Sequence, residues 1–199
     1  MDRLSKIMTE QLIRKNKIDA QQSEIYRYGL RLILADLVNF AIILACGVLL
    51  KRVLCALVFL LVFCSVRKYS GGFHAKTFWL CRLTMAVTFL SVVGVSEMLC
   101  RNPYGTQTLI VLNLVSVAVI ACFAPVRHPN KKLTEKQKKT NKRNAITASV
   151  VFGAVSAGLV KVNNTISVTI GLTLTAIAVL MLIGILNTRG GKQNAGLDL

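Results

Sequence analysis

Charged residues are scarce in this sequence of 199 residues. They make up 17% of the chain, hydrophobic residues make up 54%, and the mean hydropathy is +0.58. These values lie well to the apolar side of ordinary water-soluble domains, so a soluble globular fold is not expected. Apolar runs of roughly 16 to 21 residues recur instead, and about 20 such residues let a helix cross the hydrocarbon core of a membrane.

Features of several other protein classes are missing as well. The first apolar run begins near Leu30, after a long basic segment, and no small-residue cleavage site follows it, so no secretory signal peptide is expected. No glycine-rich phosphate loop or other cofactor fingerprint is present, which argues against a kinase, a nucleotide-binding protein or a dehydrogenase, and no cofactor is expected. The two histidines, His74 and His128, lie in different loops, which is too poor a ligand supply for a metal site of the zinc type.

Acidic residues are few: eight, against twenty-five Lys and Arg, which gives a net charge of +17. On a soluble protein this charge would suggest nucleic-acid binding, but here the basic residues lie between apolar runs, so no nucleic acid is expected as a partner. Basic residues of membrane proteins collect in cytoplasmic segments. With the N-terminus inside, twenty-one of the twenty-five fall in the cytoplasmic segments 1–31, 67–82, 125–144 and 187–199. This distribution predicts six crossings of the cell membrane, with both termini in the cytoplasm.

Six apolar runs are predicted to form transmembrane helices. They are Leu30–Leu50, Val53–Val66, Leu83–Cys100, Thr108–Ala124, Ala145–Val160 and Ile166–Leu186. The second run is short, because its roughly 14 residues would reach only about 21 Å as a helix. It must therefore thin the bilayer, borrow flanking residues or form a re-entrant element.

The segments outside these runs complete the predicted organisation. Residues 1–29 place apolar side chains at helical spacing among basic ones: Leu4, Ile7, Met8 and Leu12. This pattern predicts an amphipathic interfacial helix on an anionic membrane surface, the alternative being a helix packed on the rest of the protein. Residues 30–186 form the membrane domain, and 187–199 a flexible cytoplasmic tail. The predicted fold class is all-α: a polytopic membrane protein with about six transmembrane helices.

Six cysteines would predict a disulfide framework in a small secreted protein, but most of them lie in apolar surroundings here. Thiols in such runs behave as small hydrophobic side chains, so five are interpreted as structural: Cys46, Cys55, Cys64, Cys100 and Cys122. Cys81 differs, because it lies in a polar, aromatic and basic stretch.

The stretch from Arg67 to Arg82 is the part of the chain that suggests chemistry. It holds His74, Cys81 seven residues later, and the pair Gly71–Gly72. A cysteine nucleophile reacts as the thiolate, which a nearby imidazolium, cation or helix N-terminus stabilises. Two residues seven apart in an unbroken helix are about 10.5 Å apart along the axis. Part of 71–81 must therefore leave the helix for a Cys/His pair to form, and the glycines permit a turn. The alternative is an ordinary loop histidine and an interfacial cysteine.

This stretch resembles the accessory gene regulator B (AgrB) family of membrane endopeptidases. The resemblance is carried by Arg67, Gly71–Gly72, His74–Ala75 and Cys81, spaced as in that family. A second, basic segment also matches the family: Pro125, Asn130, Lys131, Lys132 and Leu133. Length, number of spans and their order agree, so the resemblance covers nearly the whole chain, although only these two segments carry recognisable motifs.

The resemblance implies a cysteine endopeptidase of quorum sensing. Such an enzyme cuts a short propeptide on the C-terminal side of the future signal and holds it as a thioester on Cys81, with His74 as general base. An internal Cys or Ser of the peptide then attacks the thioester and closes a thiolactone or lactone ring, the autoinducing peptide. Exchange of one thioester for another is nearly isoenergetic, which suits a thiol enzyme that keeps water out.

The resemblance also implies partners and supporting residues. The propeptide carries an amphipathic leader and an acidic tail, and the basic cytoplasmic face is complementary to that tail and to anionic lipid. Arg67 is expected to bind a substrate carboxylate or to hold the thiolate, the alternative being a membrane-flanking anchor. Lys131 and Lys132 match family lysines, although eight basic residues in that loop would set its side of the membrane regardless of substrate. A homodimer is the assembly that the resemblance favours.

No acid close to His74 is an evident partner for its imidazole. Asp36 and Glu97 lie within predicted spans and are candidates for orienting the ring, the alternative being an interhelical hydrogen bond. Two other function classes stay open from the sequence: a peptide exporter without proteolytic activity and a non-catalytic membrane scaffold. Paired interrupted helices or an inverted repeat would favour an exporter, and neither is visible in the sequence.

Overall fold

The computed structural model of the chain describes residues 2–14, 23–71, 78–126 and 134–194. These residues form seven helices and contain no strand, so the predicted all-α class is confirmed. The helices are α1 (Asp2–Arg14), α2 (Ser23–Leu49), α3 (Val53–Ser70), α4 (Phe78–Arg101), α5 (Gly105–Phe123), α6 (Glu135–Leu159) and α7 (Asn164–Asn194).

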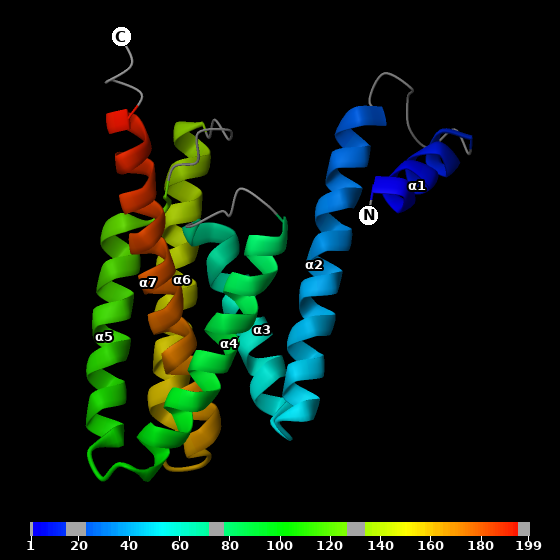
Figure 1. Ribbon diagram of the computed structural model, residues 1–199. Helices are drawn as coiled ribbons and strands as arrows, with labels where there is room; N and C mark the ends of the chain where they lie inside the picture. The colour runs from blue at the N-terminus through cyan, green and yellow to red at the C-terminus, as the bar shows by residue number, and fades with distance from the viewer. Residues whose placement is uncertain (1, 15–22, 72–77, 127–133, 195–199) are drawn as a thin grey trace.

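Helices α2 to α7 stand side by side and alternate in direction, whereas α1 lies obliquely against α2 (Figure 1). Helix α7 is central, because it packs against α3, α4, α5 and α6. One end of the bundle therefore carries the start of α2, the end of α3, the start of α4, the end of α5 and the start of α6. We call it the basic end, since the cations there include Arg27, Arg31, Arg67, Lys68, Arg82, Lys138 and Lys142.

Five of the described helices are long and apolar enough to cross a membrane. They are Ser23–Leu49, Val53–Ser70, Trp79–Arg101, Gly105–Phe123 and Asn164–Leu186. Helix α6 is not among them, because its first half carries five basic residues: Lys136, Lys138, Lys139, Lys142 and Arg143. The apolar part of α6 nevertheless packs beside α3, α5 and α7. The chain is thus a polytopic helical membrane protein, and its sixth crossing stays a prediction.

Helix α3 corresponds to the short second predicted span and is longer than the sequence predicts. It continues past Val66 to Ser70, and its 18 residues reach about 27 Å along the axis. The last turn tolerates Arg67 and Lys68 because basic side chains near a helix C-terminus complement its dipole. Of the three alternatives, the borrowing of flanking residues is the one that the structure supports.

Three other boundaries differ from the sequence predictions. Helix α2 begins at Ser23, before the expected Leu30, and α1 ends at Arg14. Cys81 lies inside α4, whose start at Phe78 precedes the expected Leu83. Helix α7 continues to Asn194, so residues 187–194 are helical rather than a flexible tail. The reason is that propagation of an existing helix into polar sequence costs little once its nucleus is formed.

Helix α1 packs on α2 with its polar side. Ser5 and Thr9 are buried, whereas Leu4, Ile7 and Met8 are 40 to 57% exposed. This is the reverse of what a helix on a soluble core shows, since such a helix buries its apolar stripe. The exposed apolar side chains therefore favour the predicted membrane-surface helix over one that packs on the protein through that stripe.

Helices α5, α6 and α7 are joined by hydrogen bonds between buried polar side chains. The Asn113 amide donates to Ser156 Oγ at 3.0 Å, and Ser156 and Ser167 each donate to the carbonyl oxygen of the other at 2.8 and 2.6 Å. Between helices in lipid, such bonds satisfy groups that hydrocarbon cannot. Gly171 of α7 allows this approach, because a Cβ there would lie 2.5 Å from Leu109 Cδ1 and 2.8 Å from Asn113 Oδ1.

Gly171→Ala is expected to destabilise the bundle by about 1–3 kcal/mol, the usual cost of adding a methyl group to a packed interior. The measurement is thermal unfolding of the purified protein in detergent. Gly94→Ala is the matched control, since a Cβ on that helical glycine meets no atom within 4 Å. Equal unfolding temperatures for the two variants would contradict the assigned α5–α7 packing.

Candidate active site

Cys81 lies in the first turn of α4 at the basic end of the bundle, where it is partly buried. Backbone N–H groups in the first turn of a helix lack carbonyl partners, and the helix dipole favours negative charge near them. Partial burial leaves the sulfur accessible to a substrate while limiting its contact with water. All six cysteines are free, so the Cys81 sulfur is a thiol.

Arg67 lies one turn before the end of α3, with its guanidinium carbon 5.1 Å from the centre of the Phe63 ring. The guanidinium is within electrostatic range of the Cys81 and Cys64 thiols. The antiparallel register agrees, because Phe59 of α3 contacts Phe89 of α4 with ring centres 5.3 Å apart. Arg67 lies eight residues after Phe59 on α3, and Cys81 lies eight residues before Phe89 on α4. The same antiparallel pairing therefore places Arg67 and Cys81 at the same level of the bundle. The structure thus brings together the predicted nucleophile and a predicted supporting cation.

Asp36 of α2 extends this group of residues across a third helix. Its carboxylate is within electrostatic range of Cys64, which is also in range of Arg67. The sequence analysis interpreted Cys64 as structural only, yet it lies among the residues around Cys81. Its three-residue spacing from Arg67 was the available signal, since residues three apart on a helix are neighbours.

Gly71 ends α3 and turns the chain out of the helix, as its position before His74 predicts. Its φ is 70° and its ψ is −151°, a conformation that glycine adopts without steric cost. Its N–H donates to the Arg67 carbonyl oxygen at 3.1 Å. Gly72 and His74 lie outside the described residues, so the distance between His74 and Cys81 stays a prediction.

The second motif segment begins beside the first. After α5 the chain passes through Pro125 to Val126, whose N–H donates to the Ser70 carbonyl oxygen at 3.0 Å. The start of the connection between α5 and α6 therefore lies against the end of α3. Lys131 and Lys132 belong to the part of that connection outside the described residues.

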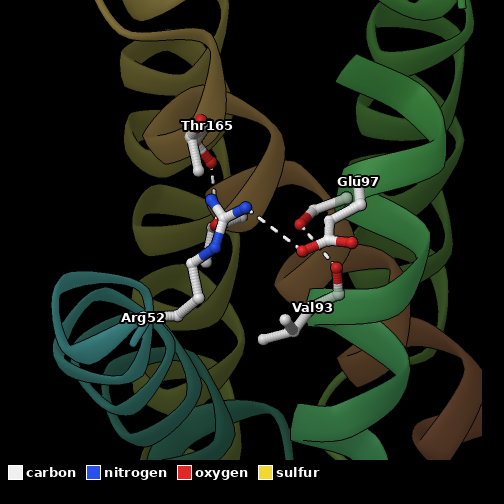
Figure 2. Close-up of polar contacts among 6 residues, drawn as sticks. Arg52, Val93, Glu97 and Thr165 are labelled. Atoms are coloured by element: carbon white, nitrogen blue, oxygen red, sulfur yellow. Dashed lines mark hydrogen bonds and ion pairs between the residues drawn. The ribbon is translucent and has the colours of Figure 1, made fainter. Parts of the chain in front are cut away.

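Glu97 lies at the opposite end of the bundle, so the structure does not bring it to Cys81. Sixteen residues of helix α4 separate the two, which corresponds to about 24 Å. Figure 2 shows the Arg52 side chain between Thr165 and Glu97, and its guanidinium forms an ion pair with the Glu97 carboxylate at 3.1 Å. Two hollows of about 240 and 100 Å³ flank Arg52, and neither includes Cys81 or Arg67 among its lining residues.

A bundle of apolar helices, with a cysteine and an arginine brought together at its basic end, defines a polytopic membrane protein with a candidate thiol site. The chain belongs to the accessory gene regulator B family, whose sequence model matches residues 5–185. The family resemblance noted from the motifs is confirmed.

Relatives with this family name come from several bacteria. The chain is 30% identical over 169 residues to an AgrB-like protein of Clostridium beijerinckii, covering 85% of this chain and 80% of that protein. It is 31% identical over 163 residues to an AgrB-like protein of Listeria welshimeri, covering 77% and 75%. Accessory gene regulator protein B of Staphylococcus lugdunensis is 26% identical over 141 residues, covering 71% and 73%. No solved structure matches the chain.

Proposed function

We propose that this protein is a membrane cysteine endopeptidase that matures a quorum-sensing propeptide, with Cys81 as nucleophile and His74 as general base. The observation that carries the proposal is the approach of the Arg67 guanidinium to the Cys81 thiol at the basic end of a bundle of this family. A fixed cation beside a partly buried sulfur stabilises the thiolate, which is the reactive form.

The proposed reaction has two transfers of one acyl group. The Cys81 thiolate attacks the carbonyl carbon of the cleaved peptide bond, the C–N bond breaks, and His74 gives its proton to the departing amine. A thioester on Cys81 results. A thiol or hydroxyl inside the same peptide then attacks this thioester, its proton passes to His74, and the Cys81 thiolate leaves as the ring closes.

Asp36 is the acid that we propose for orienting the imidazole of His74. Its carboxylate is in electrostatic range of Cys64, and Cys64 and Cys81 are both in range of Arg67. A carboxylate that holds one ring nitrogen sets the tautomer with which the other nitrogen accepts a proton. Glu97 is left out, because it is paired with Arg52 far along α4.

The proposed substrate has an acidic tail, and α6 offers cations at the basic end to meet it. Lys138 and Lys142 precede buried Ala145 by seven and three residues, which places both nearer to the bundle side of α6 than Lys136 or Arg143, with Lys138 partly buried and Lys142 exposed. Arg143 lies on the other side, in line with exposed Val150, where anionic lipid would meet it. We place this end in the cytoplasm of the cell, because it holds most of the basic residues.

The experiment that tests the function follows the thioester. The purified protein in anionic vesicles is mixed with a propeptide that has an amphipathic leader, a central Cys and an acidic tail. The mass of the protein should rise by that of the N-terminal fragment, and neutral hydroxylamine should remove this mass, because it cleaves thioesters. Release of the intact propeptide across the vesicle membrane, with no adduct and no cleavage, would instead support an exporter, and binding alone a scaffold.

Lys138→Gln with Lys142→Gln is expected to raise the KM for the propeptide about fivefold at low salt, the scale of two partly exposed charge contacts. The difference from the unsubstituted protein should shrink as salt screens the charges. Lys136→Gln with Arg143→Gln removes the same charge from the other side of α6 and is the control. Equal KM values for the two double variants would contradict the placement of the tail.

A further inference from the structure

The end of α3 is held by the chain that follows α5. Ser70 is fully buried, and its carbonyl oxygen accepts the Val126 N–H at 3.0 Å. Ala124 is buried and Val126 packs against the hydrophobic core, so the donor is itself anchored. We call this contact the Ser70–Val126 bridge.

Glycine at position 71 is required by the same contact. A Cβ on Gly71 would lie 3.0 Å from the Val126 carbonyl oxygen and 3.4 Å from the Val126 nitrogen. Its φ of 70° also lies where side chains with a Cβ are strained. The last residue of α3 and the first after it therefore both touch Val126.

Direct packing between α3 and α4 is slight compared with the packing of each helix on α7. The aromatic contact of Phe59 with Phe89 lies two helical turns away from Arg67 and Cys81. Near the basic end, the position of Arg67 relative to Cys81 therefore depends on whatever restrains the last turn of α3. The Ser70–Val126 bridge is one such restraint, beside the packing of Tyr69 on the hydrophobic core.

We propose that Val126 is a positioning residue of the Cys81 site, which it serves by holding the last turn of α3 so that the Arg67 guanidinium stays close to the sulfur. The expected change in kcat rests on the proposed function. The position that the bridge gives to Arg67 does not depend on that function. The backbone N–H of Val126, in the chain that follows α5, thereby becomes part of the Cys81 site. The expected signature is a lower kcat at nearly constant KM, because the bridge aligns reacting groups and does not bind the tail.

The test replaces Val126 by its α-hydroxy acid, which exchanges the N–H for an ester oxygen and keeps the side chain. The expected result is a kcat about tenfold lower with KM within about twofold, together with slower alkylation of Cys81 by iodoacetamide. Val126→Ala is the matched control, since it keeps the N–H, and should retain most of the kcat. Gly71→Ala should reproduce the defect, and Gly94→Ala should not.

Two outcomes would overturn the inference. One is a folded ester variant, judged by circular dichroism and size-exclusion chromatography, with unchanged kcat and unchanged Cys81 alkylation. The other is a defect in Val126→Ala as large as in the ester variant, which would assign the effect to side-chain packing. Cys81 alkylation, read by mass spectrometry at that residue, needs no propeptide. If the unsubstituted protein cleaves nothing, the proposed function fails and this readout still decides the inference.

Discussion

Replacing Cys81 by alanine is expected to abolish thioester formation and propeptide cleavage, with a loss of about 10⁴-fold or more, as for other catalytic nucleophiles. Cys81→Ser should be nearly as inactive, because a hydroxyl at this position ionises far less readily than a thiol. The measurement is the rate at which the acidic tail is released from the propeptide in anionic vesicles. Binding of the propeptide should survive, since the cations of α6 are unchanged.

Cys64→Ala is the sharpest control for this result. Cys64 is in electrostatic range of Arg67, as Cys81 is, but it lies on α3 and is also in range of Asp36. Its removal should change the cleavage rate only a few-fold, roughly what loss of a packing contact near a site produces. Cleavage that persists in Cys81→Ala, or that disappears in Cys64→Ala alone, would show that the nucleophile has been assigned to the wrong sulfur.

Arg67→Gln is expected to lower kcat about 10²-fold, the usual cost of losing one fixed group that stabilises charge in an active site. The physical reason is that the Arg67 guanidinium is in electrostatic range of both the Cys64 and the Cys81 thiols. Arg67→Lys should recover only part of the rate, because the ammonium lacks the planar group that stacks on Phe63. Initial rates over a range of propeptide concentrations separate kcat from KM.

Lys68→Gln is the matched control for Arg67, since it removes the same charge from the neighbouring, exposed position of α3. It should leave kcat unchanged and alter only the salt dependence of KM. If Arg67→Gln raised KM alone, the arginine would bind a substrate carboxylate. If both variants behaved alike, Arg67 would be a membrane-flanking anchor.

Local pattern was enough to predict much of the helical frame. The five apolar runs that match membrane-length helices were visible in hydropathy, because hydrocarbon forces the backbone to satisfy its own hydrogen bonds. The turn at Gly71 was likewise predictable, since a glycine pair before His74 permits the chain to leave a helix. Helix ends were less predictable. Basic residues at the end of α3 and polar residues at the end of α7 continue the helix, although hydropathy marks a boundary there.

The expectation for Glu97 shows a different limit. Its distance from Cys81 follows from sequence separation once α4 is known to be one unbroken helix, so a firmer helix assignment would have excluded it. Asp36 and Cys64 are a different case. They lie on α2 and α3, and nothing in either segment shows that the two helices bring them together.

By itself, the sequence determined that the chain is a helical membrane protein with most of its cations at one end and a single cysteine in a polar setting. Those properties depend on composition and on spacing within one helix. The tertiary structure alone decided that Arg67 comes within electrostatic range of Cys81 and that the Val126 N–H donates to the Ser70 carbonyl oxygen. Contacts of this kind depend on how α7 sets the positions of the helices around it, which is a property of packing among residues far apart in the chain.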